Sequence, residues 1–446
     1  MNSNDTNIRG PEEIKLSAGM DEVGTVFLQE GKIFRRINHN KKAFVKSILA
    51  DEYLMADISK AGMIETKIHK DDGRDLVLEH KLVRFQTFWN EWTFEMLRDA
   101  ALTTIDLTIH LIERRLCLKD AHPYNILFDG SKPVFVDFGS IVELTNGCRK
   151  AWEESFFSEF YLQLNYSFRS AFTSRLARQL LFITENHPRL KSRIGKYGRS
   201  LPAWKKSFPK ALSFAKALQL LRSDLSSTRA PKSDSEWGDY YQRDQLPSLE
   251  DISTYTLKER SARECLEAIT IKSGDPSLLD LASNAGWFSQ LAAQLGYNVA
   301  AADYDRNAIS SLYQDLGGIQ PTLKITPVVF DILRPTPVHG LGEIWAGTFS
   351  RLSSDVVLAM ALQHHLVVGQ GVTFDGFCDI IDKLCKTYAV VEFIEKDDVH
   401  IREKVRDFDW YSKNTFIDAM SKCFVLEKDL PSHPSTRRVL LFRKLL

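Results

Sequence analysis

Hydrophobic and polar positions follow different rhythms in the two halves of the chain. Before residue 222, short alternating runs predict β-hairpins, and a long stretch of helical spacing follows them. After residue 250, short apolar runs alternate with amphipathic stretches, as in proteins whose strands and helices take turns along the chain. The change of rhythm predicts one domain over residues 20–222 and a second over residues 251–446.

In the first half, the segments TVFL and IFRRI flank the turn QEGK, and the segments MIETKI and LVLEH flank the turn at 71–73. Both patterns predict hairpins. Apolar residues with helical spacing predict a helix from Phe94 to Leu116. The strands NILF and VFVDF should flank Asp129-Gly130, and residues 151–222 read as further helices.

Residues 223–250 are polar and rich in serine, and they predict a linker. The second half then predicts five strands with helices between them, at 277–282, 298–303, 325–330, 355–359 and 388–394. The last two strands, 423–428 and 437–443, are joined by a segment too short for a crossover helix, so they should form an antiparallel hairpin. This order predicts a doubly wound α/β sheet that ends in a hairpin.

Carboxylates follow the first strands of this second half. Asp280 ends one strand, and Asp303 ends the next, 23 residues later. Gly286 provides a turn that a ligand could approach, and Asp303 suits a pair of ribose hydroxyls. These features fit a dinucleotide or S-adenosylmethionine. The absence of GxGxxG and the third strand-end carboxylate, Asp331, favour S-adenosylmethionine over NAD.

The segments LLDLASNAGWFS, AADYD and VFDI resemble three motifs of class I S-adenosylmethionine-dependent methyltransferases, which have a Rossmann-like fold. The resemblance implies that Asp280, Ser283, Asn284 and Gly286 surround the methionine part of the cofactor. It also implies that Asp303 holds the ribose and that Asp331 reaches the adenine.

The fourth strand runs into His364-His365, at the edge of the sheet where the cofactor is expected. An imidazole there could take a proton from an acceptor hydroxyl or amine. A pair that only bonds the backbone at the strand end is the alternative reading. Glu392 and Glu395, after the fifth strand, could shape the acceptor pocket.

The first half contains LKDAHPYNILFDGSKPVFVDFGS, with Asp120, Asn125 and Asp137 in the order of a protein-kinase catalytic loop and DFG motif. The resemblance implies an α+β kinase-like domain in which Asn125 and Asp137 would hold magnesium of Mg-ATP. No glycine-rich loop accompanies these residues. The strand lysine has only weak candidates, Lys41, Lys42 and Lys67, which favours a degenerate scaffold over an active kinase.

A kinase-like half followed by a methyltransferase half resembles bacterial two-part methyltransferases, including a rhizobial host-specific nodulation protein. That resemblance implies methyl transfer to a glycan or a glycan precursor, such as a lipid-linked saccharide. Two alternatives remain open: a bifunctional enzyme that phosphorylates and then methylates its acceptor, and a regulator that binds S-adenosylmethionine without turnover.

Composition narrows the setting. The formal net charge is zero, so no global field favours nucleic acid as a partner. Scattered cysteines, no CxxC pair, a polar start and no long apolar run predict a cytoplasmic protein without a membrane span. Between residues 191 and 232 there are eleven Lys or Arg and one acid. We expect this stretch to be a solvated helix face; the alternative is that it attracts a phosphorylated or lipid-linked acceptor or an anionic membrane surface.

Overall fold

A computed structural model describes residues 13–16, 21–161, 213–230, 247–271, 274–318, 323–340 and 345–445. The helices expected over 162–212, most of the basic stretch 191–232 and the middle of the expected linker lie outside these ranges. Among the described helices, none combines the length and the apolar character needed to cross a bilayer.

The first half begins with an antiparallel sheet in the order β1-β2-β3-β5-β4. Its strands are β1 (Ile14–Lys15), β2 (Gly24–Gln29), β3 (Lys32–Ile37), β4 (Thr66–Asp71) and β5 (Leu76–His80). Both expected hairpins are therefore confirmed. Two helices that the sequence analysis missed, α1 (Lys42–Ala50) and α2 (Glu52–Lys60), connect β3 to β4.

A helical layer follows this sheet. The central helix α3 (Phe94–Glu113) begins where the Thr93 hydroxyl accepts from the Met96 amide, 3.3 Å away. It ends three residues earlier than expected, because Arg115 turns left-handed and Leu116 starts a strand. Two short pairs come next, β6 (Leu116–Leu118) with β9 (Ile141–Glu143) and β7 (Ile126–Asp129) with β8 (Lys132–Phe135), and then α4 (Asn146–Ser155) and a π-helical segment, Phe156–Tyr161.

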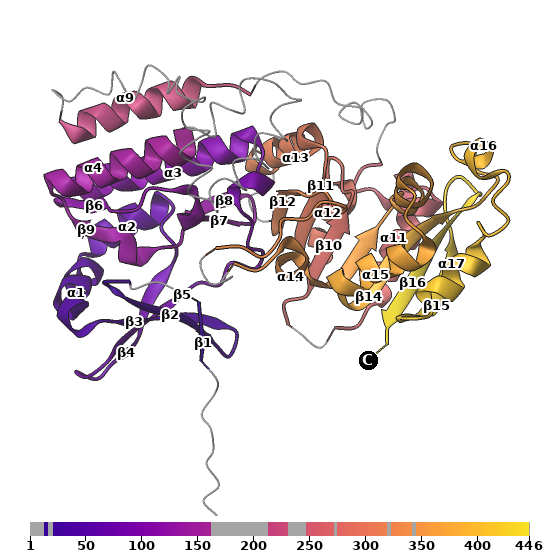
Figure 1. Ribbon diagram of the computed structural model, residues 1–446, viewed down its shortest axis with the longest axis horizontal. Coiled ribbons are helices and arrows are strands. Elements are labelled where there is room, and N and C mark those ends of the chain that lie inside the picture. Colours follow the sequence, from indigo (N-terminus) through magenta and orange to yellow (C-terminus); the bar gives the residue numbers. More distant parts are fainter. Residues whose placement is uncertain are drawn as a thin grey trace, which may run out of the picture.

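The boundary expected at residue 222 is wrong. Helix α9 (Phe214–Ser227) continues past it and packs along α3, burying Leu218, Leu221 and Leu225 in the core of the first half (Figure 1). Apolar side chains at three- and four-residue spacing pack against α3, so their burial rather than the serine-rich composition decides where the helix ends. The first half therefore extends at least to Ser227.

The described part of the second half forms a sheet in the order β12-β11-β10-β13-β14-β16-β15. The first five strands are parallel, and β14, β16 and β15 pair antiparallel in succession. Its strands are β10 (Ser277–Leu281), β11 (Asn298–Asp303), β12 (Ile325–Val329), β13 (Ser354–Ala359), β14 (Cys385–Ile394), β15 (Phe424–Pro431) and β16 (Arg437–Lys444). The α/β plan and its terminal hairpin are thus confirmed.

Helices cover both faces of this sheet, because alternate strand residues point to opposite sides and both sides are apolar. Leu278 contributes to the core under α11 (Leu257–Ala268), α12 (Trp287–Gln294) and α13 (Arg306–Gly318). Leu279 contributes to the core under α14 (Thr348–Leu352), α15 (Phe374–Leu384) and α17 (Lys413–Met420). The short α16 (Arg402–Val405) lies beyond β14.

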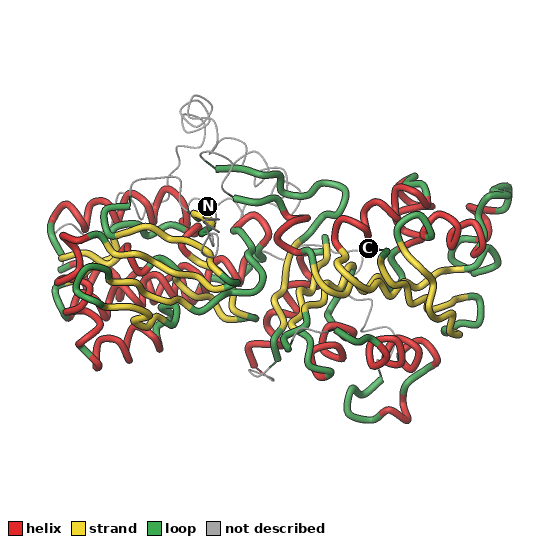
Figure 2. Tube along the Cα trace, turned by 90° about the horizontal axis from the view of Figure 1, so that it is seen from below, coloured by secondary structure: helices red, strands yellow, loops and turns green. Residues whose placement is uncertain are grey.

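The two halves pack directly against each other, as both views show (Figures 1 and 2). The contact centres on a buried ion pair between Arg351 of α14 and Glu91 of the first half. The Tyr124 ring stacks on Trp345 at a centroid distance of 4.5 Å. Since the ion pair is removed from water and partly buried aromatic rings stack beside it, the halves form one structural unit rather than two domains on a flexible tether.

Candidate functional site

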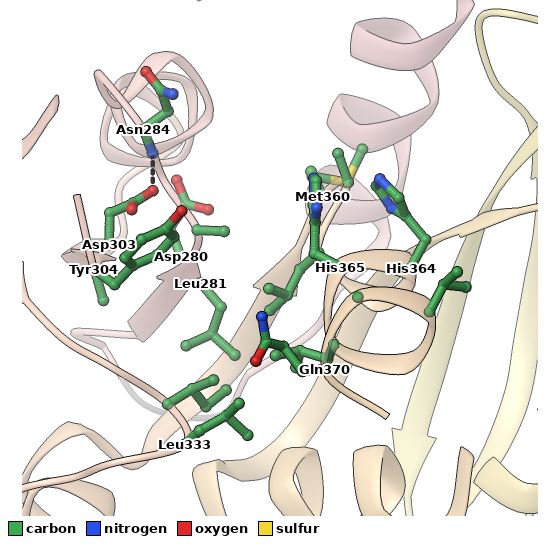
Figure 3. A pocket seen from close by; sticks show the side chains of 18 of the residues that line it. Asp280, Leu281, Asn284, Asp303, Tyr304, Leu333, Met360, His364, His365 and Gln370 are labelled. Carbon is green, nitrogen blue, oxygen red and sulfur yellow. Dashed lines mark hydrogen bonds between the residues drawn. The ribbon is translucent and has the colours of Figure 1, made fainter. Parts of the chain in front are cut away.

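A cavity of about 610 Å³ opens where the parallel strands β10 to β14 end. Parallel sheets bind ligands at this edge, at the point where the strand order reverses. Here the reversal lies between β10 and β13. Figure 3 shows Asp280, Asp303 and Asn284 on one side of the cavity and Met360, His364 and His365 across from them.

Asp303 ends β11 and lines the cavity while remaining almost entirely buried. Its Oδ2 accepts from the Asn284 amide at 2.9 Å, and its Oδ1 accepts from the Asp305 amide at 2.8 Å. Burial raises the pKa of Asp303 to about 6, although these amides act in the opposite direction. The backbone bonds fix the carboxylate and leave lone pairs on both oxygens for hydroxyl donors.

Asp280 is the last residue but one of β10 and lies in the same wall. Its Oδ2 accepts from the Ser289 hydroxyl at 2.6 Å, and burial raises the pKa of the carboxyl to about 7. A buried carboxylate with a raised pKa is stabilised by any cation that comes beside it. The environment of Asp280 is therefore suited to an ammonium group of a ligand.

The backbone around the cavity is strained. Of the five non-glycine residues with positive φ in the described ranges, three line it: Ala282, Asn284 and Ala361. Left-handed alanines are uncommon and cost roughly 1–3 kcal/mol each, and such residues concentrate at functional sites. The sequence analysis chose Asn284 but had no signal for the two alanines.

Gly286 provides the expected turn but is not among the residues that line the cavity, so its role in ligand approach stays a prediction. It adopts φ +81°, and a Cβ at this position would lie 2.6 Å from Leu312 Cδ1 of α13. The glycine thus allows α13 to pack closely on the start of α12. Ser283 is not among the lining residues either, and within the described ranges its buried Oγ has no hydrogen-bond partner.

Asp331 follows β12 and lines the cavity on the same side as β10 and β11. Its Oδ1 accepts from the Leu333 amide at 3.1 Å, and Arg334 Nη1 lies 3.4 Å from its Oδ2. Three carboxylates thus stand at the ends of three adjacent strands, in the order that the sequence predicted.

The two histidines differ in environment. His364 is buried, whereas His365 is exposed, and their rings lie 4.0 Å apart. Burial, with a smaller effect of His365, lowers the pKa of His364 to about 2. His364 is therefore a poor proton acceptor near neutral pH, which corrects the expectation that either imidazole could be the base.

Glu392 and Glu395 do not line the cavity. Glu392 is fully buried behind it and accepts from the Ser432 hydroxyl at 2.7 Å. Lys258 Nζ of α11 lies 3.2 Å from Glu392 Oε2, and the Arg437 guanidinium of β16 lies 4.0 Å from the same oxygen. The two cations do line the cavity, and Glu392 positions them. Sequence reasoning missed both, since neither belongs to a strand-end motif.

In the first half, Asp137 is already paired. Its Oδ1 lies 2.6 Å from Arg35 Nη2, and a second Arg35 nitrogen is bonded to Asp21. Arg35 lies on β3 and is buried. The pKa of the neighbouring His80 is lowered to about 3, mainly by the burial of His80 itself and to a smaller extent by the charge of Arg35. The guanidinium occupies the position beside Asp137 where a metal ion would be needed, so this arrangement does not fit the expected magnesium site.

The other kinase-like residues are engaged within the fold. The Asn125 amide donates to the Asp120 carbonyl at 2.9 Å. Lys67, on β4, pairs with Glu79. Lys42 begins helix α1 and donates to the Arg74 carbonyl, so it is not the strand lysine that the sequence analysis sought. Among the described residues, no three His, Cys, Asp or Glu side chains gather into a metal-binding group.

Comparison with known proteins finds one relative that the chain matches over nearly its whole length. No protein-family model matches the chain. The chain is 27% identical over 472 residues of the alignment to the nodulation protein NoeA of Rhizobium meliloti (strain 1021), and the alignment covers 94% of this chain and 94% of NoeA.

Two solved methyltransferase structures align with part of the chain at low similarity. The N-methyltransferase NodS from Bradyrhizobium japonicum WM9 is 15% identical with a TM-score of 0.30, covering 42% of this chain and 97% of NodS. The magnesium protoporphyrin IX methyltransferase ChlM from Synechocystis PCC 6803, with bound SAH, is 11% identical with a TM-score of 0.33, covering 46% of this chain and 94% of ChlM.

Proposed function

We propose that the chain is an S-adenosylmethionine-dependent methyltransferase whose second half holds the cofactor and transfers its methyl group. The observation that carries the proposal is the row of carboxylates Asp280, Asp303 and Asp331 along one wall of the cavity. Asp303 accepts from the ribose hydroxyls, Asp331 from the adenine amino group, and Asp280 from the ammonium group. The cavity volume lies within the range of small-molecule sites.

The same wall argues against a dinucleotide. A pyrophosphate carries negative charge and needs backbone amides that approach it closely, usually across glycines. Here Gly286, the glycine of the loop after β10, faces Leu312, and two buried carboxyls stand beside this loop. The bound cofactor supplies an electrophilic methyl group next to a positive sulfur. The residues of this chain bind and orient it and keep water from the buried wall.

The first half acts as a scaffold in this proposal. The Arg35 guanidinium already neutralises Asp137, the carboxylate that the kinase resemblance assigns to magnesium, which weighs against the bifunctional alternative. Its contacts instead support the segment after β12. That segment lines the cavity at Asp331 and then rests on the first half, where Asn90 donates to the Thr336 hydroxyl at 2.7 Å.

The similarity to NoeA, which is named a nodulation protein, supports a proposal about the biological role of the chain and its methyl acceptor. We infer a related role for this chain, with a glycan or a lipid-linked glycan precursor as the methyl acceptor. An acceptor hydroxyl or amine would use the exposed His365 as its base, because His364 stays neutral and buried.

Calorimetric titration of the purified protein with S-adenosylmethionine, S-adenosylhomocysteine and NAD tests the assignment. We expect both sulfur compounds to bind at one site and NAD to give no saturable heat. Binding of NAD in preference to the sulfur compounds, or binding of none of the three, would contradict the proposal.

A further inference from the structure

The cavity has two chemically different sides. The wall from β10 to β12 carries the three carboxylates, whereas the lining contributed by β13 and all later elements contains no carboxylate. Its polar groups all bear nitrogen: His364, His365, Gln370, His400, Lys404 and Arg437. A second ligand that occupies this side therefore meets hydrogen-bond donors and cations.

The inner cation on this side is balanced from behind. Arg437 Nε donates to Asp398 Oδ2 at 3.0 Å, and the backbone amide of His400 donates to Asp398 Oδ1. Burial raises the pKa of Asp398, but these bonds outweigh it and hold the pKa at about 2. Arg437 is thus fixed in place, with Asp398 and Glu392 compensating Arg437 and Lys258.

Lys404, on α16, is not balanced in this way. It lines the cavity and is exposed, and among the residues that the structure describes no carboxylate lies within ion-pair distance of it. The neighbouring His400 also lines the cavity and is exposed. Because the inner charges cancel, the Lys404 ammonium group gives the acceptor side its net positive charge.

We propose that the methyl acceptor carries an anionic oxygen, a carboxylate or a phosphate, that binds between Lys404, His400 and Arg437; this rests on the methyltransferase function proposed above. Unlike the hydroxyl or amine considered above, an anionic oxygen needs no base, so His365 would then only contact the acceptor. It attacks the methyl carbon with a lone pair, and the carbon–oxygen bond forms as the carbon–sulfur bond breaks. The electron pair of the broken bond stays on sulfur, and no proton is released.

The test uses the full chain saturated with S-adenosylhomocysteine, titrated separately with acetate and with inorganic phosphate at constant ionic strength. We expect saturable binding of at least one anion, weakened about fivefold to tenfold by Lys404→Ala through loss of a charge-assisted contact. Acetate binding alone indicates a carboxylate acceptor, and phosphate binding alone indicates a phosphate acceptor. Binding of both supports the shared chemistry.

Lys422→Ala is the matched control, because it removes the same charge from an exposed lysine that pairs with Asp375 outside the cavity. No saturable anion binding, or equal loss in Lys404→Ala and Lys422→Ala, overturns the anionic acceptor. Heat from S-adenosylhomocysteine itself keeps the two proposals separate. If it binds and the anions do not, only the acceptor proposal fails.

Discussion

Arg351 and Glu91 lie 260 positions apart in the sequence, yet their side chains form a two-point ion pair in the interior. Arg351 Nη2 and Nη1 lie 2.5 and 2.9 Å from the two oxygens of Glu91. Glu91 also accepts from the Thr348 hydroxyl and the Phe88 amide. Burial alone would raise the pKa of Glu91, but these partners outweigh it, so the pKa is lowered and the carboxylate remains charged.

Removing one member of this pair should destabilise the whole chain. Arg351→Leu leaves a buried carboxylate without its counter-ion, and we expect a loss of about 3–5 kcal/mol in the free energy of unfolding. Urea denaturation followed by circular dichroism measures it. Arg406→Leu, at the exposed pair with Glu403, is the control and should change the free energy by less than about 0.5 kcal/mol. Similar losses in both variants would contradict the central position of Glu91.

Asp303→Ala should weaken cofactor binding. The carboxylate accepts charge-assisted hydrogen bonds from two ribose hydroxyls. Its loss should weaken the binding free energy of S-adenosylhomocysteine by roughly 2–4 kcal/mol, which calorimetry measures as a raised Kd. Asp275→Ala is the matched control, because Asp275 precedes β10 at the opposite edge of the sheet, where it pairs with Lys324. Calorimetry that finds the same Kd in wild type and Asp303→Ala would remove Asp303 from the site.

Gly286→Ala should cost more stability than an equivalent change elsewhere. Both Gly286 and Gly296 have positive φ, but only at Gly286 would the new Cβ meet a side chain, that of Leu312. Gly296→Ala therefore measures the backbone strain alone, about 1–2 kcal/mol. We expect Gly286→Ala to lose about 1–3 kcal/mol more, in line with overpacking of a core. Equal melting temperatures of the two variants would rule out the packing role.

Stability should depend on pH through His364. Its pKa is lowered from 6.5 to about 2 in the folded protein, so below about pH 6.5 the unfolded chain binds a proton that the folded chain does not. The stabilising effect is present above pH 6.5 and is lost as the pH falls, by up to about 1.4 kcal/mol per unit. Relative to wild type, His364→Leu should lose less stability between pH 6.5 and 4.5 in urea denaturation.

The buried acids of the cavity have the opposite effect to His364 on how stability changes with pH. The raised pKa values of Asp280 and Asp303 make the folded chain bind protons more readily than the unfolded chain, which favours folding as the pH falls below about 7. For this reason only the difference between His364→Leu and wild type reports on His364. A difference that stays constant across the pH range would contradict its burial as a neutral imidazole.

Asp137→Ala should leave the second half unaffected. Asp137 lies in the first half and pairs with Arg35, so we expect an unchanged Kd for S-adenosylhomocysteine and no Mg-ATP consumption by either protein. ATP hydrolysis with magnesium, measured by phosphate release, checks the second point. Robust hydrolysis by wild type that the substitution abolishes would restore the bifunctional enzyme.

Strand-end carboxylates could be predicted from sequence because they follow local rules. An apolar run followed by an acid places Asp280, Asp303 and Asp331 at one edge of a parallel sheet, whatever the remaining chain does. The partners that come from distant segments had no such signal. Arg437 lies in β16, the last strand, and Lys258 lies in α11, before the first strand of the second half. Only the folded sheet brings them to the same cavity.

Local pattern also failed where tertiary contacts decide the outcome. The serine-rich composition near Ser227 resembled a linker, but burial of Leu221 and Leu225 against α3 extends α9 through it. Gly286 matched a ligand-loop motif, yet its role depends on Leu312, which the motif does not contain. The kinase resemblance drew attention to the strand lysine and gave no signal for Arg35, which the sheet brings beside Asp137.

The stacking of Tyr124 on Trp345 bears on how such a protein can change over evolutionary time. Each half has its own core, so the two look exchangeable between relatives. At their junction, however, Trp345 stacks on Tyr124 and Arg351 pairs with Glu91. A half from another protein would therefore have to supply residues that form the same stacking contact and the same ion pair. Recombination at the serine-rich stretch would therefore give viable chimaeras only between proteins whose junctions already correspond, which ties the inheritance of the two halves together.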